Sequence, residues 1–152
     1  ARQEVVRYAA RDGLELEMIV VHPLDKPLFG KPPLVLIIHG GPEAHFSNGW
    51  MSGYSRPAQV LAAQGYIVAF PNYRGSTGYG RAYMLRLRGE WGVCDVADAV
   101  SGVHHLAAIG RVDPERVQAM FEASTESALT ARGRSFSLAR LPNSSALASV
   151  AP

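Results

Sequence analysis

Three short apolar runs set the strongest constraint on the fold of this chain. Residues 34–38 (LVLII) and 66–70 (YIVAF) are rich in β-branched and aromatic residues and too short for typical helices. Each is predicted to be a strand that is buried on both faces. Residues 117–121 (VQAMF) form a third candidate strand.

Segments of helical composition separate these strands. Residues 57–64 end before Gly65, and residues 95–109 carry apolar side chains at helical spacing between Asp95, a candidate N-cap, and Gly110. The alternation of strands and helices predicts an α/β fold with a mostly parallel sheet and helices on both faces. In such sheets, ligands bind beyond the carboxyl ends of the strands.

The first residues predict an N-terminal β-hairpin. Two apolar or alternating runs, 3–9 and 14–21, flank Arg11-Asp12-Gly13. Asp-Gly between such runs favours a tight turn, because glycine tolerates positive φ. A loop rich in proline and glycine follows at 22–33 and leads into the first buried strand.

Composition and charge exclude several classes of protein. The 152 residues, 47% of them hydrophobic, are enough for one domain with a buried core. A net charge of +2, from 15 basic and 13 acidic residues, is too balanced to favour binding to nucleic acid. No apolar run is long enough to span a membrane, and the first residues lack the apolar core of a signal peptide. We therefore expect a cytoplasmic protein, and the missing initiator Met indicates a processed product or a fragment.

The cysteine and the histidines predict neither a disulfide nor a metal site. Cys94 has no second cysteine in the sequence and is predicted to be a small buried hydrophobic residue. The five histidines stand at positions 22, 39, 45, 104 and 105, without the spacing of a zinc site. Each is predicted to be a surface or turn residue.

A pair of glycines follows the first buried strand, in His39-Gly40-Gly41-Pro42. Two glycines at this point allow the backbone to approach a ligand closely and to direct N–H groups at it. Such a turn can hold a developing oxyanion, which is often the largest single contribution to catalysis. The alternative is a plain tight turn, and the local sequence does not decide between the two.

Three glycines with Ser and Thr follow the second buried strand, in the stretch 72–80 (NYRGSTGYG). This stretch matches neither the phosphate-binding loop, which ends in Gly-Lys-Ser/Thr, nor the dinucleotide fingerprint. We predict a structural loop in which Arg74 satisfies nearby carbonyl groups.

Four stretches then occur in a fixed order: HGGP at 39–42, NYRGSTGYG at 72–80, RGEWGVCDVADAVSGVHHL at 88–106 and VDPERV at 112–117. Together they resemble the catalytic domain of the prolyl oligopeptidase family of serine peptidases, in particular its acylaminoacyl-peptidase-like and dipeptidyl-peptidase-like members. The resemblance runs from about residue 4 to residue 120 and covers only the N-terminal half of that domain. It implies an incomplete α/β-hydrolase fold in residues 1–121, a peptide substrate, a serine nucleophile in a Gly-x-Ser-x-Gly elbow with later Asp and His partners, and no cofactor or metal.

The resemblance also suggests roles for the residues at the strand ends. The backbone N–H of Gly41 would contribute to an oxyanion hole, whose second donor follows the nucleophile. Gly40 and, in the second turn, Tyr73, Arg74 and Gly75 would shape the site. None of their side chains is assigned a chemical step.

The family pattern breaks where the nucleophile is expected. Aligning residues 117–120 with the family's strand places Glu122 at a glycine and Ala123 at the serine. Ser124 comes one position late and is flanked by Glu122 and Glu126, where the sharp elbow requires small residues. No His follows position 105 and no Asp follows position 113, so this sequence lacks the later triad partners.

Residues 122–152 are predicted to be a divergent, flexible tail. They contain seven Ser and seven Ala, but no Asp, His, Lys, Trp or Tyr. A shifted reading frame, a truncation or natural divergence would each account for the change of composition. A Gly-x-Ser-x-Gly encoded in another frame near Met120 would identify the first.

Two functions of different kinds follow from these observations. The first is a serine peptidase of the prolyl oligopeptidase family, in which this chain alone is inactive. The second is a non-catalytic fragment or pseudoenzyme that binds a partner through an exposed sheet edge. An esterase or lipase is a weaker third reading.

Overall fold

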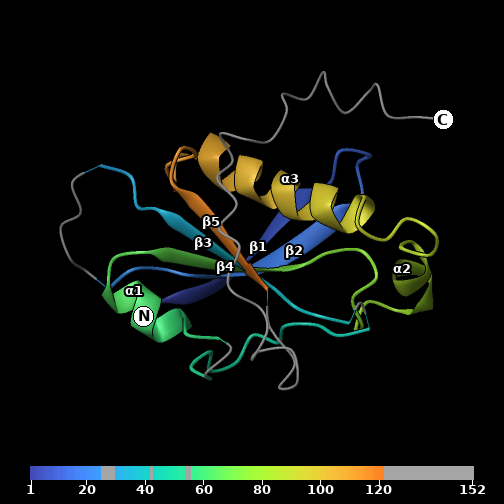
Figure 1. Cartoon of the computed structure of the whole chain (residues 1–152), viewed down its shortest axis with the longest axis horizontal. Helices are drawn as coiled ribbons and strands as arrows, with labels where there is room; N and C mark the ends of the chain where they lie inside the picture. Colours follow the sequence, from blue (N-terminus) through green and yellow to red (C-terminus); the bar gives the residue numbers. More distant parts are fainter. Residues whose placement is uncertain (25–29, 42, 54–55, 122–152) are drawn as a thin grey trace.

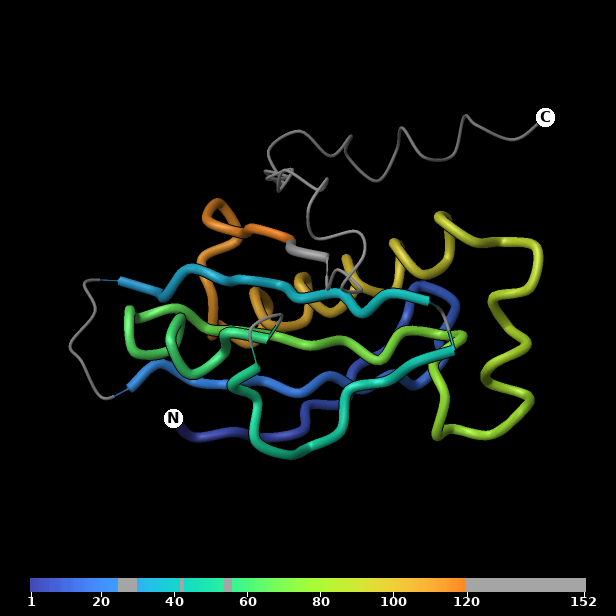
Figure 2. The backbone as a smooth tube through the Cα atoms, turned by 60° about the horizontal axis from the view of Figure 1, so that its bottom comes forward, coloured from blue at the N-terminus to red at the C-terminus, as the bar shows by residue number. Residues whose placement is uncertain are grey.

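The computed structural model describes residues 1–24, 30–41, 43–53 and 56–121. Within these residues, five strands form one sheet in the order β1-β2-β4-β3-β5, which Figure 2 shows as neighbouring traces. The strands are β1 Gln3–Ala9, β2 Glu15–Val21, β3 Leu34–Ile38, β4 Ile67–Asn72 and β5 Val117–Phe121, and the helices are α1 Ala58–Ala63, α2 Arg81–Leu85 and α3 Cys94–Ala108. The predicted tail, with Ser124 and the expected elbow, lies outside the described residues.

The three predicted buried strands pair in parallel, β4 with β3 and β3 with β5. The predicted hairpin is also present, because β1 pairs antiparallel with β2 and Gly13 takes a φ of 83° in the turn between them. The sheet as a whole is mixed, because β2 joins the hairpin to the parallel strands β4, β3 and β5 by pairing antiparallel with β4.

Side chains of alternate strand residues form two cores, one on each face of the sheet. Figure 1 shows α3 over one face and α1 over the other. On the α3 face, Leu34 and Leu36 belong to one core with Val103 and Leu106. On the α1 face the second core holds Val35, Ile37, Ala58 and Ala62. Both faces are therefore covered by a helix, as the strand and helix alternation predicted.

The helix ends agree with the sequence at their glycines but not at the predicted N-cap. Gly65 and Gly110, which follow α1 and α3, have φ values of 94° and 76°. Asp95 is not the N-cap of α3: the helix begins at Cys94, and its cap position, Val93, makes no side-chain hydrogen bond. The carboxylate of Asp95 instead lies in the first helical turn, where negative charge is favourable.

The chain crosses the sheet on opposite faces after β3 and after β4. From β3 it returns to β4 through α1 on one face, and from β4 it reaches β5 through α3 on the other. The loops that leave β3 and β4 therefore diverge. A place where the loops after two neighbouring parallel strands turn to opposite faces is called a topological switch point. Open α/β sheets bind ligands at such points, outside the carboxyl ends of the strands.

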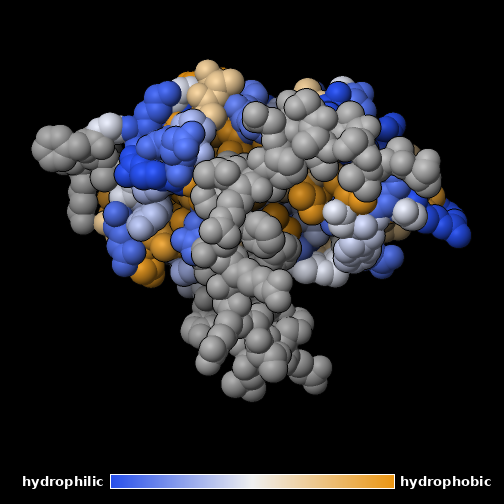
Figure 3. Space-filling model, turned by 45° about the horizontal axis from the view of Figure 1, so that its top comes forward, coloured by the Kyte–Doolittle hydropathy of each residue, from blue (hydrophilic) through white to orange (hydrophobic). Residues whose placement is uncertain are grey.

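The surface leaves several hydrophobic side chains exposed. Val93, Val96 and Ile109 are among them. Figure 3 shows hydrophobic residues lying between hydrophilic ones on one face of the molecule. Cys94 is only half-buried, and its thiol donates a hydrogen bond to the Glu90 carboxylate, so it is not the buried residue that was predicted.

No helix in the described part of the chain has the length and apolar character needed to cross a membrane.

Candidate active site

The glycine turn after β3 is open to its surroundings. Gly40 and Gly41 are exposed, and Gly41 has a φ of 48°. Apart from Gly41 and its two chain neighbours, no described residue has a heavy atom within 4 Å of the position that a Cβ of Gly41 would occupy. Among the described residues, none forms a hydrogen bond with the N–H of Gly41. This donor is therefore available to a ligand that approaches the end of β3.

His39, the first residue after β3, is buried rather than a surface residue, with 2% of its area exposed. Its ring stacks on Tyr73 at 4.4 Å between centroids. The Tyr73 hydroxyl lies 2.9 Å from the carbonyl of His39 and 3.1 Å from Nδ1. On the other side of the ring, Nε2 lies 3.0 Å from Oγ of Ser76. Of the two predicted places for the histidines, surface or turn, His39 therefore takes the turn, and its burial was not predicted because its partners are distant in sequence.

The protons of this cluster can be assigned by counting donors. Ser76 Oγ lies 2.6 Å from the carbonyl of Tyr73, which can only accept, so the hydroxyl donates there. The hydroxyl then accepts from Nε2–H of His39. Ser76 is 0% exposed, and its proton is committed to a carbonyl. The buried His39 and Ser76 pair is thus a structural link between the two turns and not a nucleophile with its base.

Arg74 is held by carboxylates rather than by the carbonyl groups that were predicted. Its backbone N–H, Nε and Nη2 donate to Asp98 of α3 at 3.0, 2.8 and 2.7 Å. Nη1 and Nη2 also donate to Asp12 of the hairpin turn at 2.9 and 3.0 Å. These hydrogen bonds raise the pKa of Arg74 and lower that of Asp12. Arg74 thereby joins the second turn to α3 and the hairpin.

Asn72, at the end of β4, fixes the loop that follows the glycine turn. Its side-chain oxygen accepts from the N–H of Phe46 at 2.8 Å, and its amide donates to the Phe46 carbonyl at 3.0 Å. The Phe46 ring packs edge-on against His39 and Phe70. The chain on both sides of the glycine turn is therefore held in place while the turn itself stays exposed.

A second histidine and serine pair lies at the surface. His45 Nε2 is 3.0 Å from Ser47 Oγ, and His45 Nδ1 is 2.9 Å from Thr77 Oγ1. In catalytic triads a carboxylate takes the place that Thr77 has here, and it stabilises the imidazolium that forms when the serine attacks. A hydroxyl carries no charge to do so. Sequence reasoning missed both pairs, and neither has a local sequence signal.

The structure brings Gly40, Gly41 and Tyr73 to one place, since Tyr73 contacts the residue before the glycine pair. Gly75 belongs to the same turn as Tyr73 but faces Leu87: an added Cβ would lie 2.6 Å from Leu87 Cδ2. Burial raises the pKa of the Tyr73 hydroxyl to about 12, so this group stays protonated and acts as a donor. Within the described residues, no three His, Cys, Asp or Glu side chains are placed to hold a metal ion.

The mixed sheet, its two helix layers and the open turn at the switch point define an incomplete α/β-hydrolase fold. Residues 52–120 match the model of the prolyl oligopeptidase family. The acylamino-acid-releasing enzyme of Sus scrofa is 38% identical over 119 residues, which are 78% of this chain and 15% of that protein. The predicted resemblance is thus confirmed: up to about residue 120, this is a prolyl oligopeptidase-family sequence.

Solved structures agree with this assignment. A puromycin-hydrolyzing peptidase of Mycobacterium tuberculosis is similar with a TM-score of 0.72 and 34% identity, over 80% of this chain and 18% of that one. An acylaminoacyl peptidase of Pyrococcus horikoshii has a TM-score of 0.67 and 28% identity, over 79% of this chain and 19% of that one. The chain therefore spans less than a fifth of the length of these relatives.

Proposed function

We propose that residues 1–121 form the part of a prolyl oligopeptidase-type serine peptidase that binds the acyl oxygen during hydrolysis of short peptides. The observation that carries this proposal is the unused N–H of Gly41 at the switch point. Donors that are fixed before reaction stabilise an oxyanion without reorganising. The contacts of His39 and Asn72 on either side of the turn supply that fixation.

In a complete enzyme of this type, the serine oxygen attacks the peptide carbonyl carbon while a histidine takes the serine proton. The carbonyl electron pair moves onto oxygen, and Gly41 donates its N–H to the resulting oxyanion. The C–N bond then breaks, and the amine leaves with the proton that the histidine returns. Water hydrolyses the acyl-enzyme by the same route.

We further propose that the 152-residue chain does not itself hydrolyse peptides. The buried Ser76 is occupied as a donor, and the exposed Ser47 lacks a carboxylate behind its histidine. In a studied serine protease, loss of the triad lowers the rate about 10⁶-fold. The rate enhancement that remains in that protease depends on the oxyanion hole and on substrate binding alone.

Treatment of the purified chain with a fluorophosphonate probe, followed by mass spectrometry, tests this proposal. We expect no labelled serine and no release of product from an acetylated or a free peptide, while a complete relative reacts under the same conditions. Labelling of Ser47, Ser76 or Ser124 would contradict the inactivity. A Ser47→Ala variant that loses the label would locate the nucleophile.

A non-catalytic binding module is the second candidate, favoured by the outer edge of β5. In the described part of the chain β5 pairs only with β3, and an open strand edge favours association with another chain. Light scattering after gel filtration tests this reading, since a compact monomer at all concentrations would contradict it. The weaker esterase or lipase reading is separated by comparing an acyl-peptide with a nitrophenyl ester as substrates of a complete relative.

A further inference from the structure

The segment that carries α2 lies at one end of the molecule, outside the layers formed by the sheet, α1 and α3 (Figures 1 and 2). Helix α2 continues into a tight turn, in which the N–H of Arg88 donates to the carbonyl of Leu85 at 3.1 Å. One side of the segment is fixed to the protein, because the Tyr83 hydroxyl donates to the backbone carbonyl at the end of β4 and Leu87 is buried. The other side faces outward.

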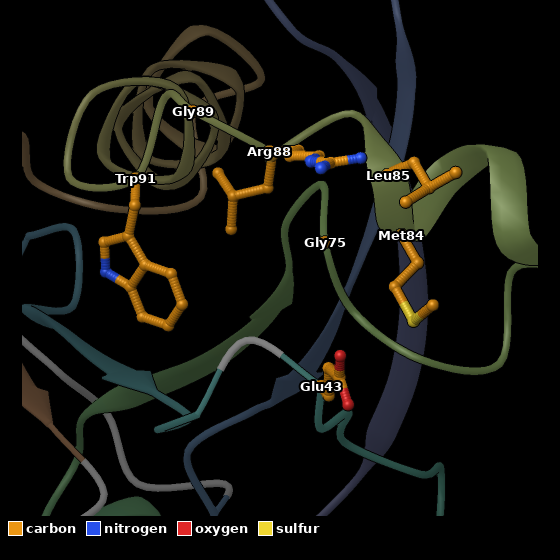
Figure 4. Close-up of a pocket in the computed structure, with 8 residues that line it drawn as sticks. Glu43, Gly75, Met84, Leu85, Arg88, Gly89 and Trp91 are labelled. Atoms are coloured by element: carbon orange, nitrogen blue, oxygen red, sulfur yellow. The ribbon is translucent and has the colours of Figure 1, made fainter.

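The outward side carries a stripe of three exposed residues, Arg81, Leu85 and Arg88, which we call the basic stripe. Residues four apart in an α-helix and three apart in a 3₁₀ turn lie on the same side, so the stripe is about 12 Å long. Arg86 is exposed beside it. In Figure 4 the Arg88 side chain extends toward Leu85, whereas Met84 reaches into the pocket that these residues border.

The positive charges at the basic stripe are unpaired within the described part of the chain. The guanidinium groups of Arg81, Arg86 and Arg88 form no salt bridge there. Glu90 is the one acidic residue in the stretch 81–93, and its carboxylate accepts a hydrogen bond from the thiol of Cys94. With three Arg and one Glu, this stretch has an excess of two positive charges, which equals the net charge of the whole chain. The rest of the sequence is balanced.

The composition of the stripe favours an acidic protein segment over other anionic partners. Leu85, 45% exposed, lies between two arginines, so an apolar side chain between two carboxylates would complement it. A phosphodiester backbone offers no apolar group at that place. Nucleic acid also favours a wider basic surface than the balanced remainder of this chain provides. Anionic membranes typically attract clusters of about four to eight basic residues, more than the three found here.

We propose that the basic stripe binds an acidic protein segment in which two carboxylates flank an apolar side chain. The carboxylates pair with Arg81 and Arg88, and the apolar side chain packs on Leu85. A helix with Glu at positions seven apart and Leu between them fits, because such residues share one face and lie about 10 Å apart. Exposed ion pairs are individually weak, so the contact is a transient one. The inference goes beyond the proposed function and does not depend on peptide hydrolysis.

Fluorescence anisotropy of a labelled acidic peptide, titrated with the full chain at low salt, tests this proposal. The peptide consists of two copies of Glu-Ala-Ala-Leu-Ala-Ala-Ala-Glu. We expect saturable binding that Arg81→Gln/Arg88→Gln weakens at least about 10-fold and Leu85→Ala about 3-fold. Arg2→Gln/Lys31→Gln is the matched control, because it removes the same charge from the residues before β1 and β3 and should keep the affinity.

A second peptide with Gln in place of every Glu isolates the contribution of charge. It should bind at least about 10-fold more weakly than the acidic peptide, and high salt should reduce that difference. Circular dichroism of each variant shows whether the fold is retained. The titration breaks no bond, so its result is independent of the serine-labelling test.

Four outcomes would overturn the proposal. They are no saturable binding of the acidic peptide, equal affinity for the Gln peptide, an equal loss of affinity in the control variant, and tighter binding to another anionic surface. Oligothymidylate and phosphatidylserine vesicles test the last of these. Tighter binding to either would assign the basic stripe to nucleic acid or to a membrane surface.

Discussion

The two turns at the carboxyl edge of the sheet use their residues in opposite ways. The turn after β4 commits its side chains to the protein: Arg74 to Asp98 and Asp12, and Ser76 to Tyr73 and His39. The turn after β3 keeps its two glycines exposed and the Gly41 N–H unused among the described residues. The longer and more specific motif is thus the scaffold, and the shorter one keeps an exposed backbone donor.

The largest expected effect comes from breaking the ion pairs of the scaffold turn. Arg74→Met leaves the Asp98 carboxylate, whose side chain is 1% exposed, without its cation. Loss of one partner of a buried pair costs about 3–5 kcal/mol of unfolding free energy. Urea unfolding followed by circular dichroism measures this loss.

Two further variants keep that prediction testable if Arg74→Met does not fold. The double variant Arg74→Met/Asp98→Asn removes both charges but keeps an acceptor for the backbone N–H of residue 74, and should recover most of the lost stability. Asp12→Asn removes the partner that is 51% exposed and should cost much less. Equal losses in Asp12→Asn and Arg74→Met would show that burial does not set the strength of this network.

The two turns should also differ in their response to an added methyl group. Gly75 and Gly41 both have positive φ, 96° and 48°, so alanine is strained at each. Only at Gly75 would the new Cβ also overlap Leu87, at 2.6 Å. We expect Gly75→Ala to cost about 3 kcal/mol and Gly41→Ala about 1 kcal/mol of unfolding free energy. Thermal melts show which of the two variants loses more stability. A larger loss of stability in Gly41→Ala than in Gly75→Ala would contradict the assignment of the turn after β4 as the scaffold and of the turn after β3 as the open one.

Local patterns were sufficient to predict the strands of this fold. The spacing of apolar residues and the glycines that follow helices are signals that extend over only a few positions of the sequence. Residues 34–38 and 117–121 were therefore predicted with the bounds that the structure has. The orientation of β2 against β4 was not predicted, because it depends on which strand the hairpin meets.

The site was predicted less completely, because its contacts join distant residues. Arg74 pairs with carboxylates 24 and 62 positions away, and no local spacing marks either partner. The burial of His39 likewise depends on Tyr73 and Ser76, more than 30 positions later. The role of Gly41 in an oxyanion hole, which the resemblance implied, stays a prediction.

A smaller effect is expected from the buried hydroxyl that links the turns. Ser76→Ala removes a donor to the Tyr73 carbonyl and a partner of His39, and should cost about 1–2 kcal/mol of unfolding free energy. Ser47→Ala is the matched control, because Ser47 also bonds a histidine but is exposed. Urea midpoints of the two variants test the prediction. A loss in Ser47→Ala as large as that in Ser76→Ala would place the structural link at the surface pair.

The smallest effect is a pH dependence at the outer end of the Arg74 network. The hydrogen bonds from Arg74 lower the pKa of Asp12 below its ordinary value of 3.8. The stabilisation by a lowered carboxyl pKa is complete above that ordinary value and disappears as the pH falls through the lowered one. Asp12→Asn should therefore be less stable than the natural chain at pH 6. This gap in unfolding free energy between the two proteins should become smaller toward pH 2.

Urea midpoints of the natural chain and Asp12→Asn at pH 6, 4 and 2 measure that gap. Salt at 1 M should narrow the gap at pH 6, because the Asp12 side chain is half-exposed and its attraction to Arg74 is screened. A gap that stays constant with pH would mean that the geometry of the Asp12 side chain, and not its charge, ties the hairpin to the scaffold turn. In that case Asp98, the buried partner, would alone provide the electrostatic stabilisation of Arg74 that distinguishes the turn after β4 from the turn after β3.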